Sequence, residues 1–431
     1  MNFTWGILGP GQIESTRRVR TLQLAATTRY FNEQAVPGLG NVWFGRQLFL
    51  ATLGVLVADR AAAEGVRVSR IAAANAIEAL ACWLALQQGP RSGESRVRGS
   101  TLLAGQHDLS FRNVNRAGFY VSQPMRMSSV SALPALGFVE ATGSRFNAFT
   151  CNAQGEAFVE AMADGCRPYR HDLVEHLVMW IRGDAVGMDS STMHQALSPV
   201  LAMPTRAREL LHTRLVQGAA GEPAEDRLRR GDALRWVRSR GRGAAPVVWE
   251  RRPEEITSEA HWADLHAGAL FFIARDAALA VLDEVELEIG TPERRFDPGA
   301  VLSPQLVVGL ATLRAAARAF LATGNQAAEA RAFCTECTAA SDAEVLRRLA
   351  GRDDRILRLL GEQIGAGPAF RGGERESAPE DTAADTAPPA DDPAWPEGIS
   401  RRIHNLWWLG LDLDGRMDEW LTPSTEEATY V

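Results

Sequence analysis

Two long apolar segments within residues 42–88 constrain the fold of this chain more than any other feature. The first extends from about residue 42 to residue 63, and its apolar members include Phe44, Leu48, Phe49, Leu53 and Leu56. Ser69 is a suitable N-cap for the second, whose apolar members include Ile71, Ile77, Leu80, Trp83 and Leu84. Both segments are apolar around much of a helical circumference, which is typical of buried helices. The sequence therefore predicts a core αα-hairpin.

Helical periodicity continues through most of the remaining chain. Residues 168–217, 257–289 and 301–360 repeat apolar side chains at helical spacing. We therefore expect a mainly α fold, built as a multi-helix bundle assembly with one small β-hairpin. A chain of 431 residues is long enough for two or three globular domains.

Changes in composition and the positions of Gly- and Pro-rich stretches suggest five segments. The expected segments are an N-terminal helical domain (1–98), a domain with the β-hairpin (99–166), a helical bundle domain (167–365), an acidic linker (366–398) and a Trp-rich segment (399–431). The linker is rich in Pro, Ala, Asp and Glu and poor in apolar residues, so we expect it to be disordered.

Residues 123–163 predict a helix, a β-hairpin and a second helix. One helical face carries Met125, Val130, Leu133 and Leu136, and Gly137 follows where a helix commonly ends. Residues 138–140 alternate apolar and polar side chains, as a half-buried strand does. Gly143 supplies the conformational freedom of a turn, and Asn152 is a suitable N-cap for the closing helix.

The run LGFVE, followed by GSRF and GEAF, resembles the end of the recognition helix, the wing and the closing helix of bacterial winged-helix proteins. In DNA-binding members the recognition helix enters the major groove and the wing contacts phosphate. The resemblance implies DNA contacts through Arg112, Arg116, Arg126, Ser128, Ser129 and Arg145. The alternative is a winged helix that binds protein or serves as a structural block. Pro134, inside the presumed recognition helix, departs from the family pattern.

Residues 227–252 form the most basic stretch, with nine Arg and two acidic residues. Two Trp residues are interleaved with the arginines, and such a mixture suits phosphate neutralisation and base stacking. From this stretch we select Arg235, Arg238, Arg240 and Arg242 as nucleic-acid-binding candidates. A helix with a solvated arginine face, or one that binds an acidic protein segment, gives the same pattern.

The C-terminal segment combines a polar linker with a cluster of large apolar residues. The candidates for partner binding are Trp407, Trp408, Leu411 and Trp420. Such a segment either docks on a partner protein as a tethered peptide or packs back on its own chain.

Charge and cysteine content indicate the source and the cellular compartment of the protein. The chain contains no Lys, so its 46 basic residues are all Arg, which is typical of a GC-rich bacterial genome. Residues 366–431 carry 14 acidic residues against 5 Arg, whereas residues 1–365 are near neutral. Five Cys residues argue against a disulfide scaffold. The N-terminus shows no signal-peptide pattern, and the apolar stretch of residues 48–58 is too short to span a bilayer, so we expect a cytoplasmic protein with no membrane contact.

No catalytic motif has specific spacing. The pair Cys334 and Cys337 lacks a second pair for zinc, and Asp172 with His176 lacks a third ligand. The glycines of residues 6–11 lack the acidic residue that a dinucleotide-binding unit places about 20 residues later. We therefore expect no catalytic residue, cofactor or metal, although scattered catalytic residues leave no motif. The expected function is non-enzymatic DNA binding within a larger assembly. The alternative is an adaptor or scaffold subunit of a protein complex, such as a genome-defence complex, whose winged helix binds only protein.

Overall fold

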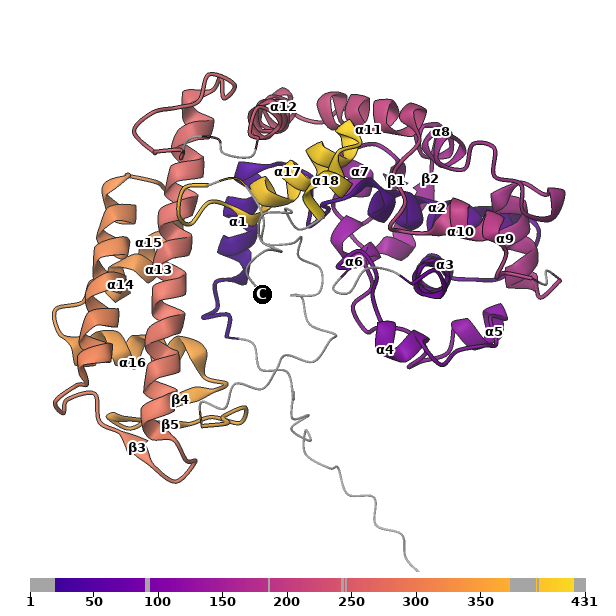
Figure 1. Ribbon diagram of the computed structural model, residues 1–431. Coiled ribbons are helices and arrows are strands. Elements are labelled where there is room, and N and C mark those ends of the chain that lie inside the picture. Colours follow the sequence, from indigo (N-terminus) through magenta and orange to yellow (C-terminus); the bar gives the residue numbers. More distant parts are fainter. Residues whose placement is uncertain are drawn as a thin grey trace, which may run out of the picture. The chain divides into compact units, whose positions relative to one another are not determined.

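The computed structural model describes residues 20–89, 94–184, 187–241, 244, 246–372, 393 and 395–421. The chain divides into two compact units, and each is discontinuous in sequence. The larger unit comprises Asn32–Leu265 and Ser377–Val431, and the smaller unit comprises Met1–Phe31 and His266–Glu376. The division falls within two helices, α1 (Ala25–Ala35) and α13 (Glu259–Ile289) (Figure 1).

The larger unit is built almost entirely of helices. Its longer helices are α2 (Gly45–Ala63), α3 (Arg70–Gln87), α8 (Ala153–Met162), α9 (Leu173–Arg182), α10 (Ser191–Leu197), α11 (Thr205–Gln217), α12 (Ala224–Arg238) and α17 (Arg401–Asp414). Its shorter helices are α4 (Ser100–Leu103), α5 (Phe111–Val114), α6 (Arg126–Ser129), α7 (Ala132–Ala135), η1 (Phe146–Ala148), η2 (Pro168–Arg170) and α18 (Met417–Leu421). Strands β1 (Val139–Ala141) and β2 (Phe149–Cys151) form an antiparallel hairpin.

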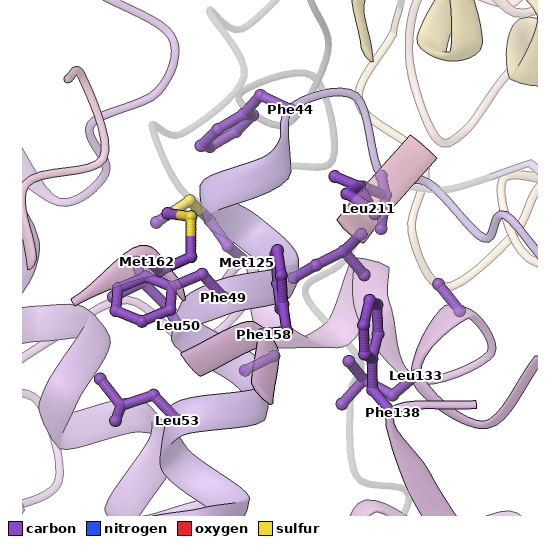
Figure 2. Close-up of a cluster of buried hydrophobic side chains, with 14 of the residues drawn as sticks. Phe44, Phe49, Leu50, Leu53, Met125, Leu133, Phe138, Phe158, Met162 and Leu211 are labelled. Atoms are coloured by element: carbon purple, nitrogen blue, oxygen red, sulfur yellow. The ribbon is translucent and has the colours of Figure 1, made fainter. Parts of the chain in front are cut away.

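Helix α2 is buried along most of its length and forms the centre of the larger unit. Its close partner is α3, because a Cβ added to Gly54 would lie 2.4 Å from the Cβ of Ala74. Figure 2 shows side chains of α2, including Phe49 and Leu53, among buried side chains from α8, α11 and the hairpin region. The two apolar helices expected within residues 42–88 are present, and the mainly α fold class is confirmed.

Helix α17 returns to the larger unit from the C-terminal end of the chain and completes its core. The carboxylate of Asp412 accepts the backbone N–H of Gly45, at the first turn of α2, over 2.7 Å. The indole of Trp407 donates to the carbonyl of Arg240, and the ring of Trp408 packs edge-on against Trp43. Burial raises the pKa of Asp412, although the N–H of Gly45 and nearby arginines act in the opposite direction.

Of the two alternatives for the C-terminal segment, the structure shows the one in which it packs back on its own chain. Trp407, Trp408, Leu411 and Trp420 are all buried. Apolar side chains point in many directions from α17, so the helix can be surrounded by α2, α11 and α12 of its own chain. In this conformation the four side chains are not accessible to another protein.

The smaller unit packs helices against a three-stranded antiparallel sheet. Its remaining elements are α14 (Pro304–Ala322), α15 (Ala328–Cys337), α16 (Asp342–Asp353), β3 (Arg295–Phe296), β4 (Leu357–Leu360) and β5 (Gln363–Ala366). The strand order is β3-β5-β4. Arg20 pairs with Glu286 over 2.6 Å and with Asp353 over 3.0 Å, which ties the first described residue to α13 and α16.

The two units do not coincide with the five expected segments. The expected boundaries near residues 98 and 166 lie inside the larger unit, and residues 399–421 belong to that unit as well. Composition identifies linkers along the chain, but only tertiary contacts show that distant segments share one core. Most of the expected acidic linker, and residues 1–19, lie outside the described residues.

By length and composition, α13 and α14 are apolar enough to cross a membrane. Core helices of soluble proteins meet the same criterion, and the most apolar window of α13 is 56% buried inside the protein. The cytoplasmic location therefore stays an expectation.

Replacing Asp412 by Ala should lower the free energy of unfolding by about 3 kcal/mol, because the buried N–H of Gly45 and the nearby charge of Arg46 lose their partner. Urea unfolding followed by tryptophan fluorescence measures the change. Asp414→Ala is the matched control, since Asp414 on the same helix forms a partly exposed pair with Arg238 and should contribute less than about 1 kcal/mol. Equal losses in the two variants would contradict the role given to Asp412.

Candidate functional site

The segment from α6 to α8 has the expected order of helix, hairpin and helix. In place of one recognition helix it contains the two short helices α6 and α7, and Pro134 has no N–H to donate to the preceding turn. Gly137 has a φ of 73°, as expected for a glycine that ends a helix, and Asn152 caps α8 by accepting the N–H groups of Gln154 and Gly155. Membership of the winged-helix family stays a prediction.

One side of the first helix of this segment, α6, faces inward and takes both predicted serines with it. Ser128 and Ser129 are buried, and α6 packs against α2. Arg126 is half-buried: it donates to Asn75 and lies 5.4 Å from the ring centre of Phe146. Groove contacts through the two serines are therefore incompatible with this conformation.

A buried carboxylate fixes the start of this helix. Glu78 on α3 accepts the backbone N–H of Met125 over 2.6 Å and that of Arg126 over 3.0 Å. It also accepts the hydroxyl of Tyr120 over 2.9 Å. Burial raises the pKa of Glu78, and the charge of Arg98 and these hydrogen bonds oppose the rise. These contacts hold α6 against α3, so the helix would have to break them to project into solvent.

Three of the predicted arginines are exposed. Arg112 and Arg145 form no ion pair among the residues that the structure describes, and Arg116 donates to Asn113. Arg145 lies at the hairpin, beside η1, whose Asn147 accepts the N–H of Ile71 at the start of α3.

The basic stretch is largely committed to contacts within the chain. Arg235 pairs with Asp232, Arg238 pairs with Asp414, and Arg240 lies over the ring of Trp395. Two further arginines of the stretch are buried in ion pairs: Arg229 with Glu225 and Asp264, and Arg230 with Glu222. Arg242 lies outside the described residues. Arginines that pair within the chain are less available to phosphate, and the nucleic-acid role of residues 227–252 stays a prediction.

A hollow that the sequence did not indicate lies between α2, α8 and α9. Its volume is about 710 Å³. Its buried apolar lining includes Leu56, Val159, Leu173 and Val178, one or two from each helix. The loop between α8 and α9 closes one side with residues 163–167. We call this feature the acidic hollow.

Acidic side chains dominate the lining of the acidic hollow. Six carboxylates (Glu64, Glu156, Glu160, Asp164, Asp172 and Glu175) face two arginines (Arg60 and Arg167). Arg60 pairs with Glu156 over 3.0 Å, and Glu64 pairs with Arg182 over 3.2 Å. Glu160 and Asp164 are exposed and make no ion pair with any other described residue. The hollow therefore favours cations and disfavours polyanions.

Sequence spacing missed this site because its carboxylates come from three separated segments. The one sequence indication was the pair Asp172 and His176, considered for metal binding. Asp172 instead caps α9 by accepting the N–H of Glu175 over 2.8 Å. His176 is buried, and neither of its ring nitrogens has a hydrogen-bond partner among the described residues. Those residues contain no group of three or more His, Cys, Asp or Glu side chains suited to hold a metal ion.

The buried His176 should make stability depend on pH. Burial lowers its pKa from the ordinary value of about 6.5, and the neighbouring His171 adds to the effect. Below that value the unfolded chain binds a proton that the folded chain resists, so stability falls as the pH falls. His176→Phe keeps an aromatic ring and removes the proton. Its free energy of unfolding should fall less steeply than that of the wild type between about pH 6.5 and pH 5, a difference of at most about 1.4 kcal/mol per pH unit. Parallel pH profiles from urea unfolding would refute this assignment.

Comparison with known proteins identifies no relative: no protein-family model, no curated protein and no solved structure matches the chain.

Proposed function

We propose that this chain is a non-enzymatic adaptor that binds a basic segment of a partner protein in the acidic hollow. The observation that carries the proposal is the combination of an apolar lining with a carboxylate-rich rim in an open hollow of about 710 Å³. The predicted partner-binding tryptophans are buried, so a partner requires another surface.

The chemistry of the hollow suits arginine or lysine side chains. Their methylene groups can lie on apolar surface while the charged end reaches carboxylates in water. Glu160 and Asp164 make no ion pair with any described residue, so a partner cation need not displace an existing one there. Opposite charges across such an interface raise the association rate and exclude acidic competitors.

A fluorescent arginine homopeptide tests the acidic hollow. We expect the full-length protein to bind it in low salt and to bind it more weakly as salt rises from about 50 to 200 mM, because salt screens charge–charge attraction. Glu160→Gln with Asp164→Asn should weaken binding about three- to tenfold, as loss of rim charges does. Fluorescence anisotropy measures both effects.

Glu140→Gln is the matched control for this experiment, because Glu140 is an exposed acid on β1 outside the hollow. It should leave the affinity for the peptide unchanged. An equal loss in the Glu140 variant would mean that the peptide responds only to net charge. Either that result or failure of the wild type to bind would remove the proposal.

Nucleic-acid binding is the second candidate function, favoured by the exposure of Arg112 and Arg145 without ion pairs to other described residues. In this alternative, the hairpin and α5 contact DNA phosphates. Arg112→Ala and Arg145→Ala should each weaken binding to a DNA duplex and lower the slope of log affinity against log salt by about 1. Arg206→Ala, an exposed arginine on α11, is the control. Gel-shift titration at several salt concentrations measures the affinity and the slope. If neither variant lowers the slope, DNA binding through Arg112 and Arg145 is excluded.

A further inference from the structure

The turn before α9 holds an exposed aromatic ring on a strained backbone. Tyr169 and Arg170 have φ values of 51° and 74°, so two consecutive non-glycine residues occupy the left-handed region. Each costs free energy that the surrounding structure must offset, and such residues cluster at binding sites. Tyr169 is nevertheless 53% exposed, so burial of this residue does not explain the strain.

Contacts on one face hold the ring of Tyr169 in place. It stacks on the imidazole of His176 with ring centres 5.4 Å apart and planes inclined by 20°. The ring of His171 continues the stack, 6.3 Å from that of His176. The hydroxyl of Tyr169 lies against Gly187, where an added Cβ would come within 2.1 Å of it. A buried histidine without hydrogen bonds thus supports a fixed aromatic ring whose exposed area faces solvent.

Two arginines neighbour Tyr169 in the sequence. Arg167 and Arg170 are exposed and form no ion pair with the other residues that the structure describes. Acidic groups lie near the turn as well: Asp172 caps α9, and Glu175 lies 3.2 Å from Nδ1 of His171. Both line the acidic hollow together with Arg167. Asp164 lies on the far side of Arg167 in the sequence, on the rim of the acidic hollow. The turn therefore carries an exposed aromatic residue between two exposed arginines of the sequence.

We propose that Tyr169, Arg167 and Arg170 form a binding site for a nucleotide unit of single-stranded nucleic acid. An unpaired base stacks on the exposed part of Tyr169, and the adjoining phosphates lie beside Arg167 and Arg170. Aromatic stacking with basic neighbours is the general means of binding single strands, and a ring fixed in advance loses little entropy when the base arrives. Bases within a duplex are stacked already, so the site discriminates against paired DNA.

Binding of the full-length protein to a labelled oligothymidine of roughly a dozen nucleotides tests the proposal, since such strands span typical single-strand sites. We expect binding to the single strand and weaker binding to the matched duplex. Tyr169→Ala should weaken single-strand binding between about fivefold and a hundredfold, the range that base stacking on an aromatic side chain supports. Tyr169→Phe keeps the stacking surface and should bind within about twofold of the wild type.

Tyr30→Ala is the matched control, because Tyr30 on α1 is also exposed, at 44%, and should not alter binding. Arg170→Gln should weaken binding and lower the salt slope by about 1. Thermal unfolding of each variant shows whether it keeps the fold. If Tyr169→Ala proves to be destabilised, the affinity of Tyr169→Phe for the single strand becomes the deciding measurement. Absence of single-strand binding, or equal affinity of the wild type and Tyr169→Ala, would overturn the proposal.

The site is distinct from the adaptor function. Glu160→Gln with Asp164→Asn should weaken binding of the arginine peptide about three- to tenfold and leave oligothymidine binding unchanged. Tyr169→Ala should weaken oligothymidine binding and leave peptide binding unchanged. Competition between the arginine peptide and oligothymidine that depends on Tyr169 would assign the ring to a protein partner, and would also overturn the proposal.

Discussion

The nearly complete burial of α2 is the constraint on which the larger unit depends. A helix that is apolar on most of its circumference needs neighbours on every side, and these are supplied by α3, the hairpin region, α8, α9 and finally α17. The last of these neighbours comes from the opposite end of the chain. Because one carboxylate of α17 caps the first turn of α2, the closing contact is polar and directional as well as apolar. A hydrophobic surface alone would define this position less sharply.

The same demand for neighbours explains why the surfaces predicted from sequence are not those that the fold presents. The helix predicted to enter DNA is held against α2 and α3 by the carboxylate of Glu78. The tryptophans predicted to dock on a partner fill the core instead. Several arginines of residues 227–252 likewise form ion pairs within the chain. The most buried of these pairs joins Arg230 and Glu222. Residue types that suit binding also suit the interior when partners are within reach.

Two of the exposed surfaces of the larger unit differ in their charged residues. Carboxylates gather at the acidic hollow between α2, α8 and α9, whereas exposed arginines lie at the hairpin, on α5 and around Tyr169. Arg167 lines the acidic hollow and stands two residues before Tyr169, so the two proposed sites adjoin in sequence. Such a division fits a protein that holds two chemically different ligands at once, and each proposed site can be tested without the other.

The sequence by itself determined the helical class, the buried αα-hairpin and the helix–hairpin–helix order near Gly143, because each follows from local periodicity, capping and turn chemistry. Gly137 and Asn152 perform the roles that their types predicted. Only the tertiary structure decided which faces point outward and which segments share a core. Burial of Ser129, return of α17 to α2, and assembly of the acidic hollow all depend on contacts between residues far apart in sequence. Local patterns carry no record of such contacts, since the same amphipathic helix fits against its own chain or against a partner.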